Sequence, residues 1–224
     1  MTIGQSLVQG QPRIPVRALA RQQAKRERIV AVAMEQFAAN GYEGCTAESI
    51  AAAACVSKGA VFGYFGSKAG LFLAAYQQAT STFSRYLDAP AEVTERGFFA
   101  VISHWLAETQ HLIGQDWVPY RVTLLGNYCS DLQLRRAITQ FMWRDDPYGT
   151  QAFVQFGIER GEVRTDIDAA VIVSMVDWLM DRCQDAIVTE ELDPGLFGGA
   201  EPQLRELRLG QFVELLRSAI GTAR

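Results

Sequence analysis

Four residues between Thr46 and Ala60 carry groups suited to binding a polyanion. Thr46 and Ser57 are typical residues for the position before a helix, where free backbone N–H groups and the helix dipole attract phosphate. Lys58 has the length and charge to reach a phosphate or a guanine edge, and Ala60 offers a methyl group to thymine. What these groups can bind depends on the elements that hold them.

Two short helices joined by a tight turn must position these groups. Ile50, Ala51 and Ala54 give the first helix an apolar side of mostly small residues, which lets another helix approach closely. A turn around Cys55 precedes the second helix, in which Val61 faces inward. This pattern predicts a helix-turn-helix motif, whose second helix enters the major groove of DNA.

The stretch from about Arg26 to Tyr76 resembles the DNA-binding domain of the tetracycline-repressor (TetR) family of bacterial transcription regulators. Many positions at fixed spacing carry the resemblance: Ile29, Ala33, Phe37, Gly41-Tyr42, Thr46, Ile50-Ala51, Val56-Ser57-Lys58-Gly59, Tyr64-Phe65, Ser67-Lys68 and Leu71. It implies backbone contacts from Thr46, Tyr64 and Lys68, and base-facing positions from Lys58 to Gly63. The DNA-binding residues expected are therefore Thr46, Ser57, Lys58, Gly59, Ala60, Phe62, Tyr64 and Lys68.

Three positions depart from the family pattern. Cys55 stands where glycine usually supplies the turn, and positive φ there would strain it. Phe62 replaces the usual tyrosine and lacks its hydroxyl, and Gly63 offers no side chain to a base. We expect few direct base contacts and more reliance on the DNA backbone and shape; a motif that no longer binds DNA is the alternative.

Composition and charge fit a cytoplasmic regulator. Of 224 residues, 49% are hydrophobic, with no apolar run of membrane-span length and no signal-peptide pattern. The four cysteines are scattered, so neither a disulfide framework nor a zinc site is expected, and no cofactor or metal is predicted. Residues 1–70 have eight Lys/Arg against four Asp/Glu, whereas residues 71–224 have thirteen against twenty-one. A basic N-terminal part on an acidic body is typical of a DNA-binding protein with a separate regulatory domain, although a balance of +4 over seventy residues also falls within ordinary scatter.

Three segments are predicted: a flexible basic arm over 1–16, the DNA-binding domain over 17–66, and a ligand-binding and dimerisation domain over 67–224. The basic run from Arg13 to Arg28 could follow phosphates or remain a solvated face. Helix patterns without strand alternation make the fold all-α, with a three-helix N-terminal domain and about nine helices beyond it. After a helix from Ser67 to about Leu87, the body helices are expected at about 92–113, 118–129, 132–144, from Asp146-Pro147 to Gly161, from Thr165 or Asp166 to 189, and 202–220.

Aromatic residues crowd the middle of the body, and the family resemblance implies an effector pocket there. Such residues are often plain core, so both readings stay open. The ligand-binding candidates are His104, Trp105, Trp117, Tyr120, Tyr128, Phe141, Trp143 and Phe153. The two histidines are seven residues apart, a spacing that favours hydrogen bonding or surface roles over metal binding.

The last two long helices are apolar on nearly every side. Such a helix needs cover all round, which indicates a partner subunit, although burial within one chain is the alternative. The resemblance implies that these helices pair into a four-helix dimer bundle. The interface residues expected are Val171, Met175, Trp178, Leu179, Phe212 and Leu216.

These patterns predict a homodimeric transcriptional regulator that binds a near-palindromic operator in double-stranded DNA. We expect a repressor that a small, largely hydrophobic effector releases from its operator. A small-molecule sensor with weakened or lost DNA binding is the alternative class. An enzyme is disfavoured because the sequence contains no recognisable set of catalytic residues. The adjacent acids Asp145-Asp146 and Glu190-Glu191 are interpreted as solvent-exposed charges.

Overall fold

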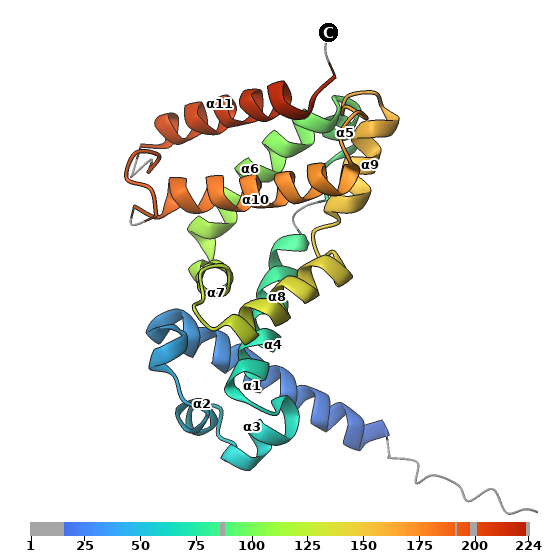
Figure 1. Cartoon of the computed structure of the whole chain (residues 1–224). Coiled ribbons are helices and arrows are strands. Elements are labelled where there is room, and N and C mark those ends of the chain that lie inside the picture. The colour runs from blue at the N-terminus through green and yellow to red at the C-terminus, as the bar shows by residue number, and fades with distance from the viewer. Residues whose placement is uncertain (1–15, 86–87, 191, 198–200, 223–224) are drawn as a thin grey trace, which may run out of the picture.

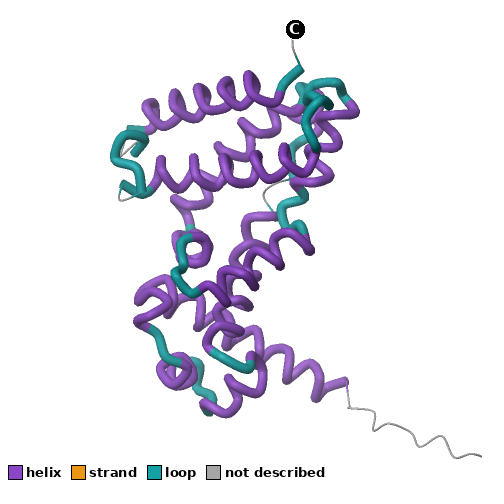
Figure 2. The backbone as a smooth tube through the Cα atoms, viewed as in Figure 1, coloured by secondary structure: helices purple, strands orange, loops and turns teal. Residues whose placement is uncertain are grey.

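The computed structural model describes residues 16–85, 88–190, 192–197 and 201–222, and almost all of the predicted arm (residues 1–15) lies outside them. The described residues form eleven α-helices and no named strand; the one β-bridge pairs Val163 with Gly221 (Figure 2). The fold is all-α, as predicted, with eight helices after the first three. The helices are α1 (Val16–Gly44), α2 (Ala47–Ala53), α3 (Lys58–Phe65), α4 (Lys68–Ser84), α5 (Ala91–Glu95), α6 (Phe98–Gln115), α7 (Trp117–Asn127), α8 (Leu132–Asp145), α9 (Thr150–Glu159), α10 (Ala169–Val188) and α11 (Pro202–Ile220).

Helices α1 to α3 form a small head at one end of the molecule, and α10 and α11 lie side by side at the other end (Figure 1). Phe37 is the fully buried centre of the head, and its ring meets the Phe72 ring edge-on at a centroid distance of 4.9 Å. The regular part of α1 ends at Gly41, where φ is 73°.

Local capping explains the two short helices of the head. The Thr46 hydroxyl accepts a hydrogen bond from the Ser49 amide, and the Ser49 hydroxyl accepts one from the Thr46 amide, which makes a reciprocal capping box. The Ser57 hydroxyl caps α3 by accepting from the Ala60 amide at 3.1 Å. Both cap positions therefore follow from residue type.

The turn between α2 and α3 places a non-glycine residue in the left-handed region. Cys55 has φ 53°, its amide donates to the Ala52 carbonyl at 3.1 Å, and the Val56 amide donates to the Ala51 carbonyl at 2.9 Å. This pair of bonds is the Schellman termination of a helix, which favours glycine at the position of Cys55. The strain anticipated at Cys55 is present.

The core of the head continues without a break into the body. Buried residues of α4, α7 and α8 join the same apolar cluster as Phe37, among them Tyr76, Val122 and Ile138. The α7 backbone comes close to α4 at Gly126, because a Cβ added there would overlap the Tyr76 ring. Helices α4, α7 and α8 are thus packed between the head and the rest of the body. The domain boundary after residue 66 stays a prediction.

Three helix boundaries differ from the prediction. The helix expected over 92–113 is divided into α5 and α6 at Gly97, where φ is 107° and the Phe98 amide donates to the Glu162 carboxylate at 2.8 Å. Asp146 ends α8 in the left-handed region, and α9 starts at Thr150, whose amide donates to the Asp146 carboxylate. Asp168, rather than Thr165 or Asp166, caps α10.

A second apolar cluster holds the far end of the body together. It is built from α6, α9, α10 and α11 around Phe98, Ile102, Val176 and Leu216. None of the helices in the described part of the chain is both long and apolar enough to cross a membrane.

Candidate functional site

The outer side of α3 and the start of α2 form one exposed surface of the head. Val61 is buried and anchors α3, while Ser57, Lys58, Gly59, Phe62 and Gly63 are exposed and Ala60 is half-buried. Thr46 is also exposed, at the N-terminus of α2. The structure therefore brings most of the expected DNA-binding residues together on one face that the described chain leaves open.

Lys58 is the cation at the start of this surface. Its ammonium contacts the Glu48 carboxylate and lies 5.6 Å from the centre of the Phe62 ring. This ion pair lowers the pKa of Glu48, chiefly through the hydrogen bond from Lys58. Both side chains are more than half exposed, so the pair is weak and the ammonium is available to another anion.

Lys68 was also expected to contact DNA, but its side chain is placed differently from that of Lys58. Its half-buried ammonium donates to the carbonyl of Tyr42 at 3.1 Å and to that of Cys45 at 3.4 Å, and it lies 4.1 Å from the centre of the Tyr42 ring. Lys68 therefore ties the start of α4 to the end of α1 and to the residue that follows it. Tyr64 and Phe65 are both half-buried, so neither ring is fully inward.

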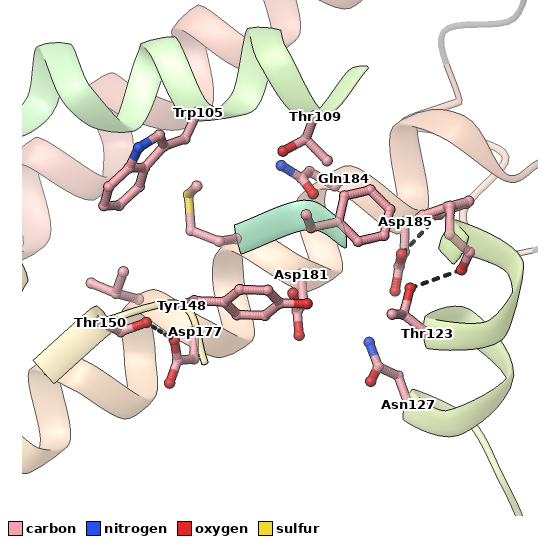
Figure 3. A pocket seen from close by; sticks show the side chains of 14 residues that line it. Trp105, Thr109, Thr123, Asn127, Tyr148, Thr150, Asp177, Asp181, Gln184 and Asp185 are labelled. Atoms are coloured by element: carbon pink, nitrogen blue, oxygen red, sulfur yellow. Dashed lines mark hydrogen bonds between the residues drawn. The ribbon is translucent and has the colours of Figure 1, made fainter. Parts of the chain in front are cut away.

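A pocket opens in the body between α4, α6, α7, α9 and α10, and Figure 3 shows it from close by (Figure 3). Its cavity volume is about 80 Å³, within a wider space of about 760 Å³ that includes open solvent. Its walls combine aromatic rings with polar side chains: Phe83, Trp105, Thr109, Tyr120, Thr123, Asn127, Tyr148, Thr150, Val176, Asp177, Met180, Asp181, Gln184 and Asp185.

Of the eight ligand-binding candidates, Trp105 and Tyr120 line this pocket. Phe153 lies directly behind Trp105, with ring centres 4.2 Å apart. Trp117 packs on Tyr120 with ring centres 5.0 Å apart and is largely exposed. The other candidates, His104, Tyr128, Phe141 and Trp143, are not part of the pocket wall: Phe141 belongs to the core near the head, and Tyr128 and Trp143 are exposed.

The sequence prediction missed the polar wall of the pocket, above all three aspartates of α10. Asp177, Asp181 and Asp185 are spaced four residues apart and so lie along one side of that helix. The Thr150 hydroxyl donates to Asp177 at 2.6 Å, and the Tyr120 hydroxyl donates to Asp185 at 2.8 Å. Acids at this spacing in an otherwise apolar helix were a signal available in the sequence.

Burial raises the pKa of all three carboxyl groups. The pKa of Asp181 reaches about 8, because the group is surrounded by protein and lies beside Asp185 and Asp177. Burial is also the main cause at Asp177 and Asp185, where bonds from Thr150 and Tyr120 act in the opposite direction. No group of three or more His, Cys, Asp or Glu in the described chain is arranged to hold a metal ion.

The expected interface residues do not share one environment. Val171 and Trp178 are 57% and 73% exposed, so α10 presents them outward, and Met175, Leu179 and Phe212 are half-buried. Leu216 is only 2% exposed and packs in the core of its own chain, so this chain already buries it. Leu207 and Leu215 of α11 are exposed instead, at 57% and 72%.

The fold and its exposed α3 define an all-helical helix-turn-helix protein with a larger helical domain. The model of "Bacterial regulatory proteins, tetR family" matches residues 29–75. Over 175 residues the chain is 25% identical to the HTH-type transcriptional repressor AcnR of Corynebacterium glutamicum, an alignment that covers 76% of this chain and 86% of that protein. The family-model match and the AcnR relatives support the tetR family, as the resemblance in the sequence predicted.

Solved structures share the fold over nearly the whole chain. The regulator FadR of Bacillus subtilis, in complex with stearoyl-CoA, matches with a TM-score of 0.65 and 21% identity, covering 87% of this chain and 98% of that one. The fatty acid degradation regulator FadR of Bacillus halodurans matches with a TM-score of 0.62 and 19% identity, covering 86% and 94%. At these identities the matches establish the fold alone.

Proposed function

We propose that this protein is a dimeric transcriptional repressor that binds an operator through α3 and releases it when a small molecule occupies the body pocket. The exposed outer face of α3, with Lys58 at its start and a capped helix N-terminus, is the observation that carries the proposal. The repressors AcnR among its relatives support it.

The head supplies the two elements that groove binding needs. Backbone N–H groups at the starts of α2 and α3 are suited to phosphate contacts, and α3 is narrow on its outer side because Gly59 and Gly63 carry no side chain. A bare helix face approaches DNA closely but makes few base contacts. Recognition would therefore depend on the phosphate backbone, on Lys58 and on DNA shape.

A dimer would present two such helices to successive major grooves, about 34 Å apart. The exposed apolar side chains of α10 and α11, Val171, Trp178, Leu207 and Leu215, are the surface that a partner subunit would cover. Trp178 stands out because indole rings commonly anchor interfaces, and 73% of this one is accessible in the single chain.

Helices α4 and α7 connect the pocket to the head. Phe83 of α4 and Asn127 of α7 line the pocket, and the Tyr76 hydroxyl of α4 donates to the Asn127 side chain at 2.8 Å. Tyr76 is also part of the core of the head. A ligand that moves α7 would therefore shift α4, and with it the angle at which each head meets DNA.

The proposal is tested by fluorescence anisotropy with duplex DNA taken from upstream of the protein's own gene. We expect binding that survives excess unrelated DNA and weakens by about tenfold in Lys58→Ala, the loss of one good contact. Arg205→Ala, which removes a positive charge from α11, is the matched control and should bind normally. Equal affinity of the wild type for upstream and unrelated DNA would refute the proposal.

A further inference from the structure

The aspartate row of α10, Asp177, Asp181 and Asp185, faces a cavity whose lining side chains carry no positive charge. None of the fourteen side chains that line the pocket is Lys, Arg or His. The nearby Arg182 is exposed and outside the pocket wall; its guanidinium donates to the Tyr128 hydroxyl at 2.8 Å and to the Leu192 carbonyl at 3.0 Å, and its charge acts on Asp185 only from that position. Asp177 and Asp185 accept hydrogen bonds from Thr150 and Tyr120, whereas Asp181 accepts none from the described part of the chain.

Two of these carboxyl groups have unused hydrogen-bonding capacity. Asp185 is 4% exposed, and its Oδ2 has no hydrogen-bond partner among the described residues although it is buried. Asp181 makes no hydrogen bond or ion pair within the described chain, and it keeps accessible surface although protein surrounds it. That combination places Asp181 on the wall of the cavity, and an unsatisfied acid in such a place points to a ligand.

Aromatic rings stand beside the carboxylates. Trp105 and Tyr120 line the same pocket, and the side chains of Tyr148, Asp177 and Asp181 converge on one part of it (Figure 3). Ring faces attract cations, and desolvated sites strengthen that attraction. Rings and acids together recognise an organic cation better than they recognise a neutral apolar molecule.

We propose that the pocket binds an organic cation, a protonated amine or quaternary ammonium group on an apolar body, with the charge at Asp181 and the body against the aromatic wall. The inference names the effector class and rests on the proposed function only for its effect on DNA. It narrows the earlier expectation of a largely hydrophobic effector. A metal ion is disfavoured because the described residues form no metal-binding group.

Binding is measured on the full-length protein without DNA, by thermal shift and calorimetry at pH 8. The probes are three sets of compounds with phenyl, cyclohexyl and hexyl bodies, each set containing the amine, the alcohol and the carboxylate on the same three-carbon linker. Benzyltrimethylammonium and stearoyl-CoA complete the panel. We expect at least one amine to bind ten or more times tighter than its matched alcohol, and the carboxylates and stearoyl-CoA not to stabilise the protein.

Variants test whether the positive charge of the ligand lies at Asp181. Asp181→Asn should lower the affinity of that amine at least tenfold and leave the weak affinity of the alcohol unchanged, whereas Glu206→Gln, an exposed acid of α11, should change neither. Should Asp181→Asn fold poorly, Asp177→Asn should give a smaller loss in the same direction. Equal binding of alcohol and amine, preference for an anion, or no binding of any cation at 10 mM overturns the inference. Failure of DNA binding leaves these results unaffected, so the two proposals are judged separately.

Discussion

The raised pKa of Asp181 predicts a protein that loses stability as the pH rises. In the unfolded chain this carboxyl group titrates near its ordinary value of 3.8, whereas in the folded protein its pKa is about 8. Between these values the folded state holds a proton that the unfolded state has released. The free energy of unfolding therefore falls with pH, by at most about 1.4 kcal/mol per pH unit for this group.

From pH 5 to pH 7 that slope amounts to at most about 2.7 kcal/mol, or a fall in Tm of roughly 5–10 °C for a chain of this size. Asp177 and Asp185 also make the free energy of unfolding fall as the pH rises, because burial raises the pKa of each. Tyr120 and Tyr148 contribute nothing in this range, because burial raises their pKa further and they stay neutral. The slope should therefore belong mainly to the aspartate row.

The assay is urea denaturation at half-unit pH steps from 5 to 8, followed by circular dichroism. Asp181→Asn should flatten the dependence by about 1 kcal/mol per pH unit and should be more stable than the wild type at pH 8. Glu206→Gln, which removes an exposed carboxylate, should leave the slope unchanged. A wild-type stability that rises between pH 6 and 8, or an Asp181→Asn slope equal to that of the wild type, would refute the reasoning.

Three further predictions concern the head, its connection to the body, and the interface. Cys55→Gly should raise stability by up to about 1 kcal/mol in thermal denaturation, since it relieves a φ of 53° on an exposed residue; no gain would contradict that strain. Gly126→Ala should cost about 1–3 kcal/mol because the new methyl overlaps Tyr76, while Gly114→Ala has open space and should cost nothing; equal stability of the two variants would count against the close α4–α7 contact. Trp178→Asp should shift sedimentation from dimer to monomer, and an unchanged dimer would exclude α10 from the interface.

The head was predictable because its determinants are local. Thr46 and Ser57 cap helices as their residue types favour, and Phe37 fills the centre of a small core. Even the strained turn at Cys55 followed from the position that glycine usually occupies. In such a segment the neighbours that decide the structure are close in the sequence.

The structure of the body was harder to predict wherever contacts between residues far apart in the sequence determine it. Gly97 interrupts a helix pattern because the carboxylate of Glu162, 65 positions later, receives the first amide of α6. Leu216 was assigned to a partner subunit, but α11 is apolar on several sides and the sequence does not say which side its own chain covers. The aspartate row was visible as a spacing, yet its exposure to a cavity depends on how α4, α6 and α7 pack around α10.

The central claim is that the outer face of α3 enters DNA. Directed hydroxyl-radical cleavage tests this claim. An iron chelate is attached at Gly63→Cys, where an added Cβ meets nothing within 4 Å. The background carries Cys55→Ala, which removes the exposed native cysteine, and the other three cysteines are buried. We predict hydroxyl-radical cuts at two clusters of nucleotides about one helical turn apart in the protein's upstream DNA. Scattered cuts, or cuts no stronger than those from a chelate at Gln211→Cys on the exposed side of α11, would contradict it.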